Sequence, residues 1–409
     1  MQLNRKEHVT FADVENAEAV VRKVVNRTPF EISSSYSKRF SGTVYLKMEN
    51  LQRTGSFKMR GSYNKISHLD PEQRARGVIA ASAGNHAQGV ALSAALSGIR
   101  SVVVMPQYAS LAKVAATKSY GAEVILHGSS FDDAFRKCAE LQKEKGLTLI
   151  HGYNDPLVIA GQGTLGIEIA REKADLDYLV VPVGGGGLIS GIAIAMKELS
   201  PRTRIIGVQS AAMPSFAESY RLNKIVETDG GDTIADGIAI KHPGEIPFSI
   251  VSRLVDGIFT VTEDEITEAM FLLLERSKLL VEGAGASPLA LLLSGKLNVK
   301  DRKVGLVLSG GNVDLTLVRK IIMRGMMMHR RIAVVEFDTP DRPGSMKDIL
   351  NMIAGGGASV MSLQESPGSS SEALNRFYAR VVIEVEDEQH LDKLVESFRK
   401  GGLSFRLIS

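Results

Sequence analysis

The chain has 409 residues, enough for two or three domains, and 44% of them are hydrophobic, enough to form large cores. The net charge is +3, acidic and basic residues are interleaved, and tryptophan is absent. This composition argues against nucleic-acid binding and against a polybasic membrane arm. Residues 1–6 are polar, without a signal-peptide core, and no apolar run could span a bilayer. We therefore expect a soluble, cytoplasmic protein.

Cys138 is the single cysteine, so disulfides within the chain are excluded and a cysteine-based metal site is not expected. The stretch around it, residues 135–140, predicts an amphipathic helix. A thiol on the buried face of that helix is favoured over a nucleophilic thiol.

Strands and helices are predicted to alternate along most of the chain. A helix is expected over 12–26 and a strand over 44–48. Further strands are expected at 77–81, 101–105, 123–126, 147–150, 178–183, 204–208 and 304–308. The predicted helices lie at 85–97, 110–120, 131–145 and 188–198. Apolar strands separated by helices imply a parallel sheet covered on both faces, so the fold class is α/β, with two lobes and a cleft between them.

The pattern changes after residue 322. Residues 323–330 are irregular and basic, and they predict a linker whose methionines pack rather than bind a metal. The predicted order beyond it is strand 332–337, helix 345–354, strands 358–365 and 376–386, helix 388–400 and strand 403–408. This is the βαββαβ order of a ferredoxin-like domain.

Lys58 lies in the segment Thr54–Gly61, between a turn and an apolar helix, where glycines allow close approach. Partial desolvation there disfavours the ammonium form, and a neutral amine attacks an aldehyde to give a Schiff base. The alternative is a solvated surface lysine, which is the usual role of an isolated lysine.

Gly184, Gly185, Gly186 and Gly187, followed by Leu188, come after a buried strand and open a helix. Their unshielded amides favour a phosphate site over a merely tight turn. The run does not contain G-x-G-x-x-G, so it does not predict a dinucleotide site. Residues 161–166 do match that motif, but their context is helical, and we interpret these glycines as helix-packing positions.

The segment Ser82, Ala83, Gly84, Asn85 and His86 follows a strand and opens a helix. Its free amides suit a substrate carboxylate, and the Asn85 side chain can bond a phenolic oxygen. Helix capping by Ser82 or Asn85 is compatible with this role. The His86 imidazole is expected to be structural.

Ser309 begins the segment Ser309–Asn312 at the end of a predicted strand. Because the carboxyl ends of parallel strands face the ligand crevice, this segment should converge with Lys58, Gly184–Gly187 and Ser82–His86. An aldehyde-bearing phosphate cofactor, pyridoxal 5'-phosphate, accounts for all four segments together.

Residues 5 to about 320 resemble the threonine and serine dehydratases, which are fold-type II pyridoxal-phosphate enzymes of the tryptophan synthase β type. The resemblance is carried by residues 55–61, 82–89, 184–188, 235–239, 281–285 and 309–312. It implies that Lys58 is the catalytic Schiff-base lysine, that Asn85 bonds the ring hydroxyl, that Gly184–Leu188 hold the phosphate, and that Ser309 meets the pyridine nitrogen. It also places Glu282 and Asn154 near the site, without clear roles.

The implied activity is an ammonia-lyase reaction that converts L-threonine to 2-oxobutanoate, or L-serine to pyruvate. A hydroxyl at Ser309 holds the ring nitrogen protonated less well than a carboxylate would, which favours elimination over transamination. A serine-preferring or degradative dehydratase remains an alternative, as does an amino-acid sensor with an inactive catalytic lobe. Ala83 replaces the second base of the similar serine racemases, and Gln209 and Ser215 replace their divalent-metal ligands, so no divalent-metal site is expected, while a monovalent cation held by backbone carbonyls is left open.

The tail resembles an ACT regulatory domain through Asp341–Gly344, which follows its first strand. That resemblance implies pairing, hence a homodimer or homotetramer, and an amino-acid effector such as isoleucine, with valine as a second candidate. A dimerisation module without ligand is the alternative. The expected domains are a catalytic domain over 1–322, with a smaller lobe at about 50–155 inserted in the larger, a linker over 323–330 and a regulatory domain over 331–409.

Overall fold

The computed structural model describes residues 9–367 and 375–408. The chain divides into two compact units, Met1–Asp314 and Leu315–Ser409. Within the described ranges, no helix combines the length and apolar character needed to cross a membrane.

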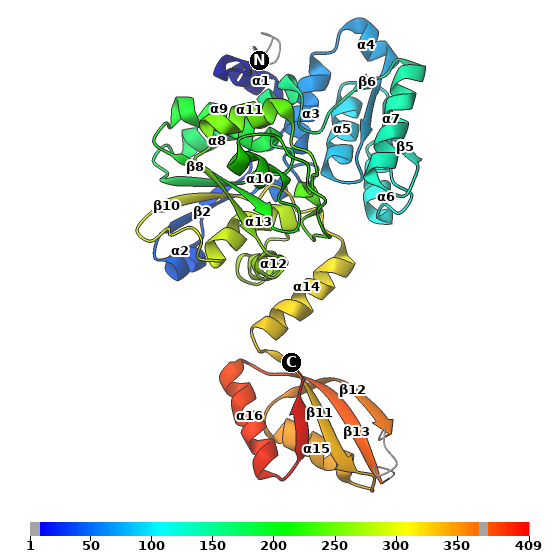
Figure 1. Ribbon diagram of the computed structural model, residues 1–409, viewed down its shortest axis with the longest axis vertical. Coiled ribbons are helices and arrows are strands. Elements are labelled where there is room, and N and C mark those ends of the chain that lie inside the picture. The colour runs from blue at the N-terminus through cyan, green and yellow to red at the C-terminus, as the bar shows by residue number, and fades with distance from the viewer. Residues whose placement is uncertain (1–8, 368–374, 409) are drawn as a thin grey trace. The chain divides into compact units, whose positions relative to one another are not determined.

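The larger lobe of the first unit is built on a six-stranded sheet with the order β1-β2-β10-β7-β8-β9. Only β1 is antiparallel to its neighbour. Helices lie on both faces of this sheet (Figure 1). Its strands are β1 (Phe30–Ile32), β2 (Thr43–Lys47), β7 (Tyr178–Pro182), β8 (Arg204–Ser210), β9 (Gly257–Val261) and β10 (Lys303–Val307). Its helices are α1 (Phe11–Val21), α2 (Ser34–Phe40), η2 (Glu49–Leu51), α8 (Pro156–Glu172), α9 (Gly187–Leu199), α10 (Ser215–Leu222), η3 (Asp236–Ile238), α11 (Glu245–Leu254), α12 (Glu263–Ser277) and α13 (Gly283–Leu293).

The smaller lobe contains a parallel sheet with the order β5-β4-β3-β6. Its strands are β3 (Val78–Ala81), β4 (Ser101–Met105), β5 (Glu123–Leu126) and β6 (Thr148–Leu149). Its helices are α3 (Lys58–Ser67), α4 (Pro71–Arg76), α5 (Asn85–Leu96), α6 (Leu111–Ser119) and α7 (Phe131–Lys145). Helix α7 has the predicted bounds, and a capping box between Ser130 and Asp133 fixes its start. Cys138 is buried on this helix, and burial raises the pKa of its thiol to about 11, which confirms a packing role.

The predicted helix-packing glycines lie inside α8, as expected. A Cβ on Gly161 would come within 2.6 Å of the Arg60 carbonyl oxygen in α3. A Cβ on Gly163 would come within 2.8 Å of the Gly191 carbonyl oxygen in α9. These glycines let α8 pack closely against both helices, and no strand precedes them as a dinucleotide motif would require.

The second unit begins with α14 (Leu315–Met328), so the irregular linker predicted at 323–330 is instead helical up to Met328. Methionine and arginine are good helix formers, so this methionine- and arginine-rich segment continues the helix. The remaining elements are β11 (Ile332–Pro340), α15 (Ser345–Gly355), β12 (Ser359–Pro367), β13 (Arg376–Glu384), α16 (Glu388–Lys400) and β14 (Ser404–Leu407). They form an antiparallel sheet with the order β12-β13-β11-β14, in agreement with the predicted βαββαβ plan.

Candidate active site

Lys58 is the first residue of α3, and the turn before it is joined to the end of β10. The Phe57 amide donates to the Ser309 carbonyl at 3.1 Å, and Ser56 forms an isolated β-bridge with Gly310. Ser309 is only 3% exposed. The predicted lysine and the predicted serine therefore lie on adjoining segments, although they are far apart in the sequence.

The Lys58 amine is partly buried and donates to the Gly152 carbonyl at 2.9 Å. Burial lowers the pKa of this amine to about 8, while the Glu282 carboxyl acts in the opposite direction. A useful fraction of neutral amine therefore exists near neutral pH, as a nucleophile or proton acceptor requires.

The glycine run joins β7 to α9 and lies against Tyr153, the neighbour of Gly152. A Cβ on Gly185 would come within 2.3 Å of Tyr153 Cγ, and a Cβ on Gly187 within 2.9 Å of Tyr153 Cα. Gly186 is the N-cap of α9, with φ of 91° and no side-chain cap. The run therefore needs glycine because another backbone segment approaches it closely.

The amides from Gly184 to Leu188 donate to no backbone or side-chain acceptor among the residues that the structure describes. Consecutive free amides at a helix N-terminus form a site for an anion such as a phosphate. These amides lie against Tyr153, and the residue before it, Gly152, accepts the hydrogen bond from Lys58.

The segment 82–86 leads from β3 into α5. Gly84 is the N-cap of α5 without a side-chain cap, and its amide donates to Ser82 Oγ at 3.2 Å. A Cβ on Gly84 would meet no atom within 4 Å, so the space beside it is open. An open helix N-terminus at this position suits a carboxylate.

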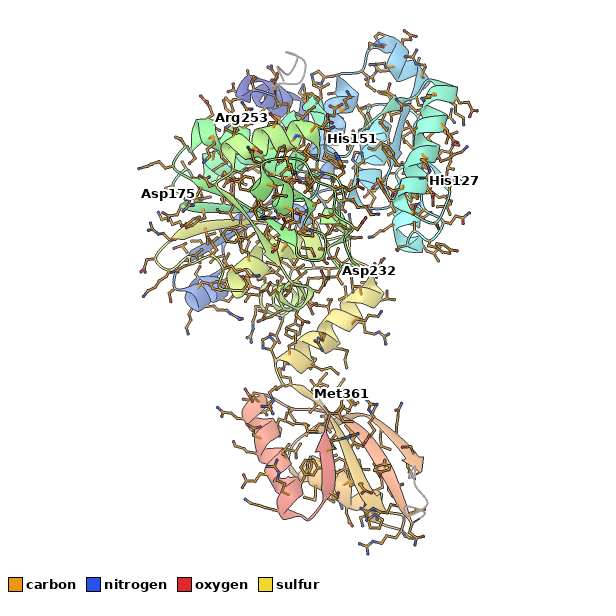
Figure 2. All side chains as sticks on the ribbon, viewed as in Figure 1. His127, His151, Asp175, Asp232, Arg253 and Met361 are labelled. Carbon is orange, nitrogen blue, oxygen red and sulfur yellow. The ribbon has the colours of Figure 1, made fainter. Side chains whose placement is uncertain are left out.

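Two histidines shape the neighbouring backbone. His86 Nε2 lies 2.7 Å from the Ile150 carbonyl, and burial, together with the charge of Lys58, lowers the pKa of His86 to about 3. Its imidazole is therefore neutral, in agreement with a structural role. His151, labelled in Figure 2, accepts hydrogen bonds from the Tyr153 and Asn154 amides at 3.2 and 2.9 Å. His151 Nδ1 therefore holds the turn at residues 151–154, which contacts both Lys58 and the glycine run.

Glu282 is a buried acid whose role sequence reasoning did not assign. Its Oε1 accepts a 2.6 Å hydrogen bond from Asn85 Nδ2. Burial raises the pKa of this carboxyl to about 7, and the charge of Asp236 acts in the same direction. The signal in the sequence was a single acid within a run of small and apolar residues, 281–286. Such an acid exchanges a proton near neutral pH, which is a common property of active-site groups.

Asn154 and Gln209 accept hydrogen bonds from backbone amides at the starts of two helices. Asn154 Oδ1 accepts from the Ile246 amide at 3.1 Å and so holds the start of α11. Gln209 Oε1 accepts from the Phe216 and Ala217 amides, both at 3.0 Å, in the first turn of α10. Ser215 donates its hydroxyl hydrogen bond to the Ile240 carbonyl. Gln209 and Ser215 therefore act as structural groups here.

The comparisons with known proteins agree with this arrangement. Residues 21–310 match the family described as "Pyridoxal-phosphate dependent enzyme". The chain is 44% identical over 402 residues to an L-threonine ammonia-lyase of Thermotoga maritima, covering 98% of this chain and 100% of that protein. It is 49% identical over 322 residues to the L-threonine dehydratase catabolic TdcB of Staphylococcus aureus, covering 78% of this chain and 93% of that protein.

Solved structures show the same similarity. Threonine deaminase isoform 2 of Solanum lycopersicum matches with a TM-score of 0.74 and 36% identity, over 78% of this chain and 88% of that chain. Maize serine racemase matches with a TM-score of 0.74 and 34% identity, over 79% of this chain and 99% of that chain.

Proposed function

This chain belongs to the pyridoxal-phosphate-dependent enzymes, and we propose that it is an L-threonine ammonia-lyase that forms 2-oxobutanoate and ammonia. The observation that carries the proposal is the combination of full-length similarity to an ammonia-lyase with a lysine bonded to the 152–153 turn, against which a run of free glycine amides packs. L-Serine, which lacks one methyl group, is a second substrate and gives pyruvate.

The residues present fit the cofactor. The free amides of Gly184–Leu188 suit a phosphate dianion, and Lys58 offers an amine with a lowered pKa. Pyridoxal phosphate, when bound, supplies an aldehyde for covalent attachment and an electron-withdrawing ring. We propose that Ser309 meets the ring nitrogen and that Asn85 meets the ring oxygen.

The residues of this chain then position the substrate and move protons. The open N-terminus of α5, from Ser82 to His86, binds the substrate carboxylate. The Lys58 amine, neutral to a useful extent near pH 8, takes the proton from the substrate Cα. The β-hydroxyl takes up one proton and leaves as water, which balances the proton removed from Cα. Hydrolysis of the resulting enamine takes up one water and releases ammonia, so the overall reaction neither gains nor loses water.

We propose that the second unit, from about residue 331, is a regulatory domain of the ACT type. A cavity of about 340 Å³ is lined there by Asp341, Arg342, Pro343, Gly344, Met346, Glu365 and Phe377, and it is the proposed effector site. Pairing of such domains supports a homodimer or homotetramer. Feedback by isoleucine would fit a biosynthetic enzyme. A catabolic role is the second candidate, because the catalytic unit is 49% identical to a catabolic dehydratase.

The test is the release of 2-oxo acids from L-threonine and from L-serine by the full-length protein, with and without isoleucine. We expect preference for threonine, inhibition by isoleucine, and no product with the Lys58→Ala variant. Activity retained by Lys58→Ala would contradict the catalytic assignment. Preference for serine without a response to isoleucine would favour a degradative enzyme whose second unit has another role.

A further inference from the structure

Three polar side chains from distant segments form one chain of hydrogen bonds at the candidate active site. Asn312 Nδ2 donates to Asn85 Oδ1 at 2.7 Å, and Asn85 Nδ2 donates to Glu282 Oε1 at 2.6 Å. Asn312 Nδ2 also donates to the Thr54 carbonyl at 2.7 Å. Thr54 lies in the turn that leads to Lys58, so the chain of bonds joins four segments of the site.

The chemistry of the donors and acceptors fixes the direction of these hydrogen bonds. A backbone carbonyl can only accept, so the Asn312 atom that faces Thr54 must be the nitrogen. The second N–H of that nitrogen points to Asn85, which must therefore present its oxygen there. The amide nitrogen of Asn85 is consequently turned toward Glu282, whose carboxylate accepts.

Two glycines, Gly55 and Gly310, leave room for the side chains that form these hydrogen bonds. Gly55 has φ of 69°, and a Cβ on it would come within 2.6 Å of Asn312 Oδ1. A Cβ on Gly310 would come within 2.4 Å of Glu282 Oε1 and 3.1 Å of Asn85 Nδ2. Any larger side chain at either position would displace an amide or the carboxyl from its bond.

We propose that Asn312 is a positioning residue that fixes the direction of the Asn85 amide, so that Asn85 presents an N–H to the ring oxygen of the cofactor. Asn85 Nδ2 carries two hydrogens, and only one is used by Glu282 within the described part of the chain. The other is available for the cofactor. If Asn85 were turned around, its carbonyl oxygen would face the ring oxygen and, above the pKa of Glu282, an ionised carboxylate, and both contacts would be repulsive.

The inference predicts a spectroscopic property. A hydrogen bond donated to the ionised ring oxygen favours the ionised form, so it lowers the pKa of the ring hydroxyl. The charged groups around Glu282, to which Asn85 is bonded, are Asp236 of η3, Lys113 of α6 and Lys58 of α3. They are unchanged by a substitution at Asn312, so a change in the ring pKa would report the lost orientation of Asn85.

The experiment compares Asn312→Asp with the wild type as full-length protein loaded with pyridoxal phosphate. The introduced carboxylate has no N–H for Thr54 or Asn85, so the Asn85 amide loses its fixed direction. We expect the visible absorption band of the ionised ring to titrate about 1–2 pH units higher. We also expect the dissociation constant of the cofactor, measured by dialysis, to rise roughly 10- to 100-fold. Asn312→Ala, which adds no charge, should shift both quantities in the same direction by less.

Asn50→Asp is the matched control. Asn50 packs against Gly311 in the same region and donates to the Leu280 carbonyl at 3.2 Å, but it makes no hydrogen bond to Asn85. The same substitution there should leave the band and the cofactor affinity as in the wild type. A shift with Asn50→Asp as large as with Asn312→Asp would overturn the inference, because the effect would then be general loosening of the region.

The inference rests on the proposed placement of the cofactor ring beside Asn85, and Asn85→Ala separates the two. If Asn85→Ala shifts the band while neither Asn312 variant does, the placement stands and the positioning role of Asn312 is wrong. If Asn85→Ala leaves the band unchanged, the ring oxygen is not at Asn85, and the inference is overturned together with that placement. Shifts with Asn85→Ala and both Asn312 variants support the inference.

Discussion

Arg60→Leu should destabilise the first unit by removing the centre of a buried ion network. Arg60 is 0% exposed and donates to both Glu49 oxygens at 2.8 and 2.9 Å. It also donates to Glu168 at 2.7 and 3.1 Å. Without Arg60, Glu168 still pairs with Lys47 at 2.9 Å. Among the described residues, Glu49 then keeps only the hydrogen bond from Thr28 Oγ1 and the more distant attraction of the Lys47 charge, and it becomes a buried carboxylate without a direct ion-pair partner.

The loss of one member of a buried pair costs about 3–5 kcal/mol. At about 2.1 cal/mol/K per residue, the 314 residues of this unit have an unfolding entropy of about 0.66 kcal/mol/K. The Tm measured by calorimetry should therefore fall by about 5–8 °C at pH 8. Arg221→Leu is the control, because Arg221 pairs with Glu218 at an exposed position and should change the stability by less than about 1 kcal/mol.

The stability lost in Arg60→Leu should also depend on pH. Burial alone would raise the pKa of Glu49, but the charge and hydrogen bonds of Arg60 hold it below its usual value. In the wild type, Glu49 therefore stabilises the fold above its unfolded pKa of about 4.3, and this contribution is lost as the pH falls through the lower folded pKa. In Arg60→Leu the folded pKa rises above the unfolded one, so the penalty grows as the pH increases from about 4.

The difference in Tm between the wild type and Arg60→Leu should thus be larger at pH 8 than at pH 5. A loss no larger than that of Arg221→Leu, or one that is equal at both pH values, would refute the argument that Arg60 compensates a buried carboxylate.

Two further predictions concern the cofactor. Gly185→Ala should weaken pyridoxal-phosphate binding by at least about tenfold, because its Cβ would lie 2.3 Å from Tyr153 Cγ and either the ring or the free amides must move. Equilibrium dialysis measures this, and wild-type affinity would show that the amides are not the phosphate site. Covalent loading of cofactor-free protein should rise with pH around a midpoint of about 8, since burial lowers the pKa of Lys58 and the neutral amine is the reactive form. A midpoint near the usual lysine value, measured by absorbance, would contradict this.

Much of the fold could be predicted where periodicity was strong and local. Helix α7 has the bounds expected from its amphipathic pattern, and the βαββαβ order of the second unit agrees with the sheet that forms. Helix α13 was not predicted, because it is buried on all sides, has no amphipathic period and contains Pro288 in its interior. Strand β1 has only three residues, too few to show alternation. Helix α1 ends at Val21, five residues before the predicted end at residue 26.

The candidate site could be predicted in part because its segments carry unusual composition. The four glycines of 184–187 and the segment 82–86 each signal free amides at a helix start. In the structure, Asn312 joins Asn85 to the Lys58 turn, and the glycine run packs on Tyr153, next to the Gly152 carbonyl that Lys58 bonds. The turn at 151–154, which contacts both Lys58 and the glycine run, has no such signal. Its role depends on where the chain passes after β6, which is a property of the tertiary fold.

The orientation of Asn85 shows most clearly what a sequence leaves open. Its residue type predicts that an amide can reach the ring oxygen, but an amide has a donor end and an acceptor end, and only one of them serves that contact. The choice is made by Asn312, 227 residues away, which is itself oriented by the Thr54 carbonyl, 258 residues from Asn312. Neither separation leaves a local pattern. Under the proposed placement of the cofactor, the polarity of the contact is therefore encoded by the backbone of the Lys58 turn, and the segment that carries the proposed Schiff-base lysine also sets the direction of the Asn85 amide.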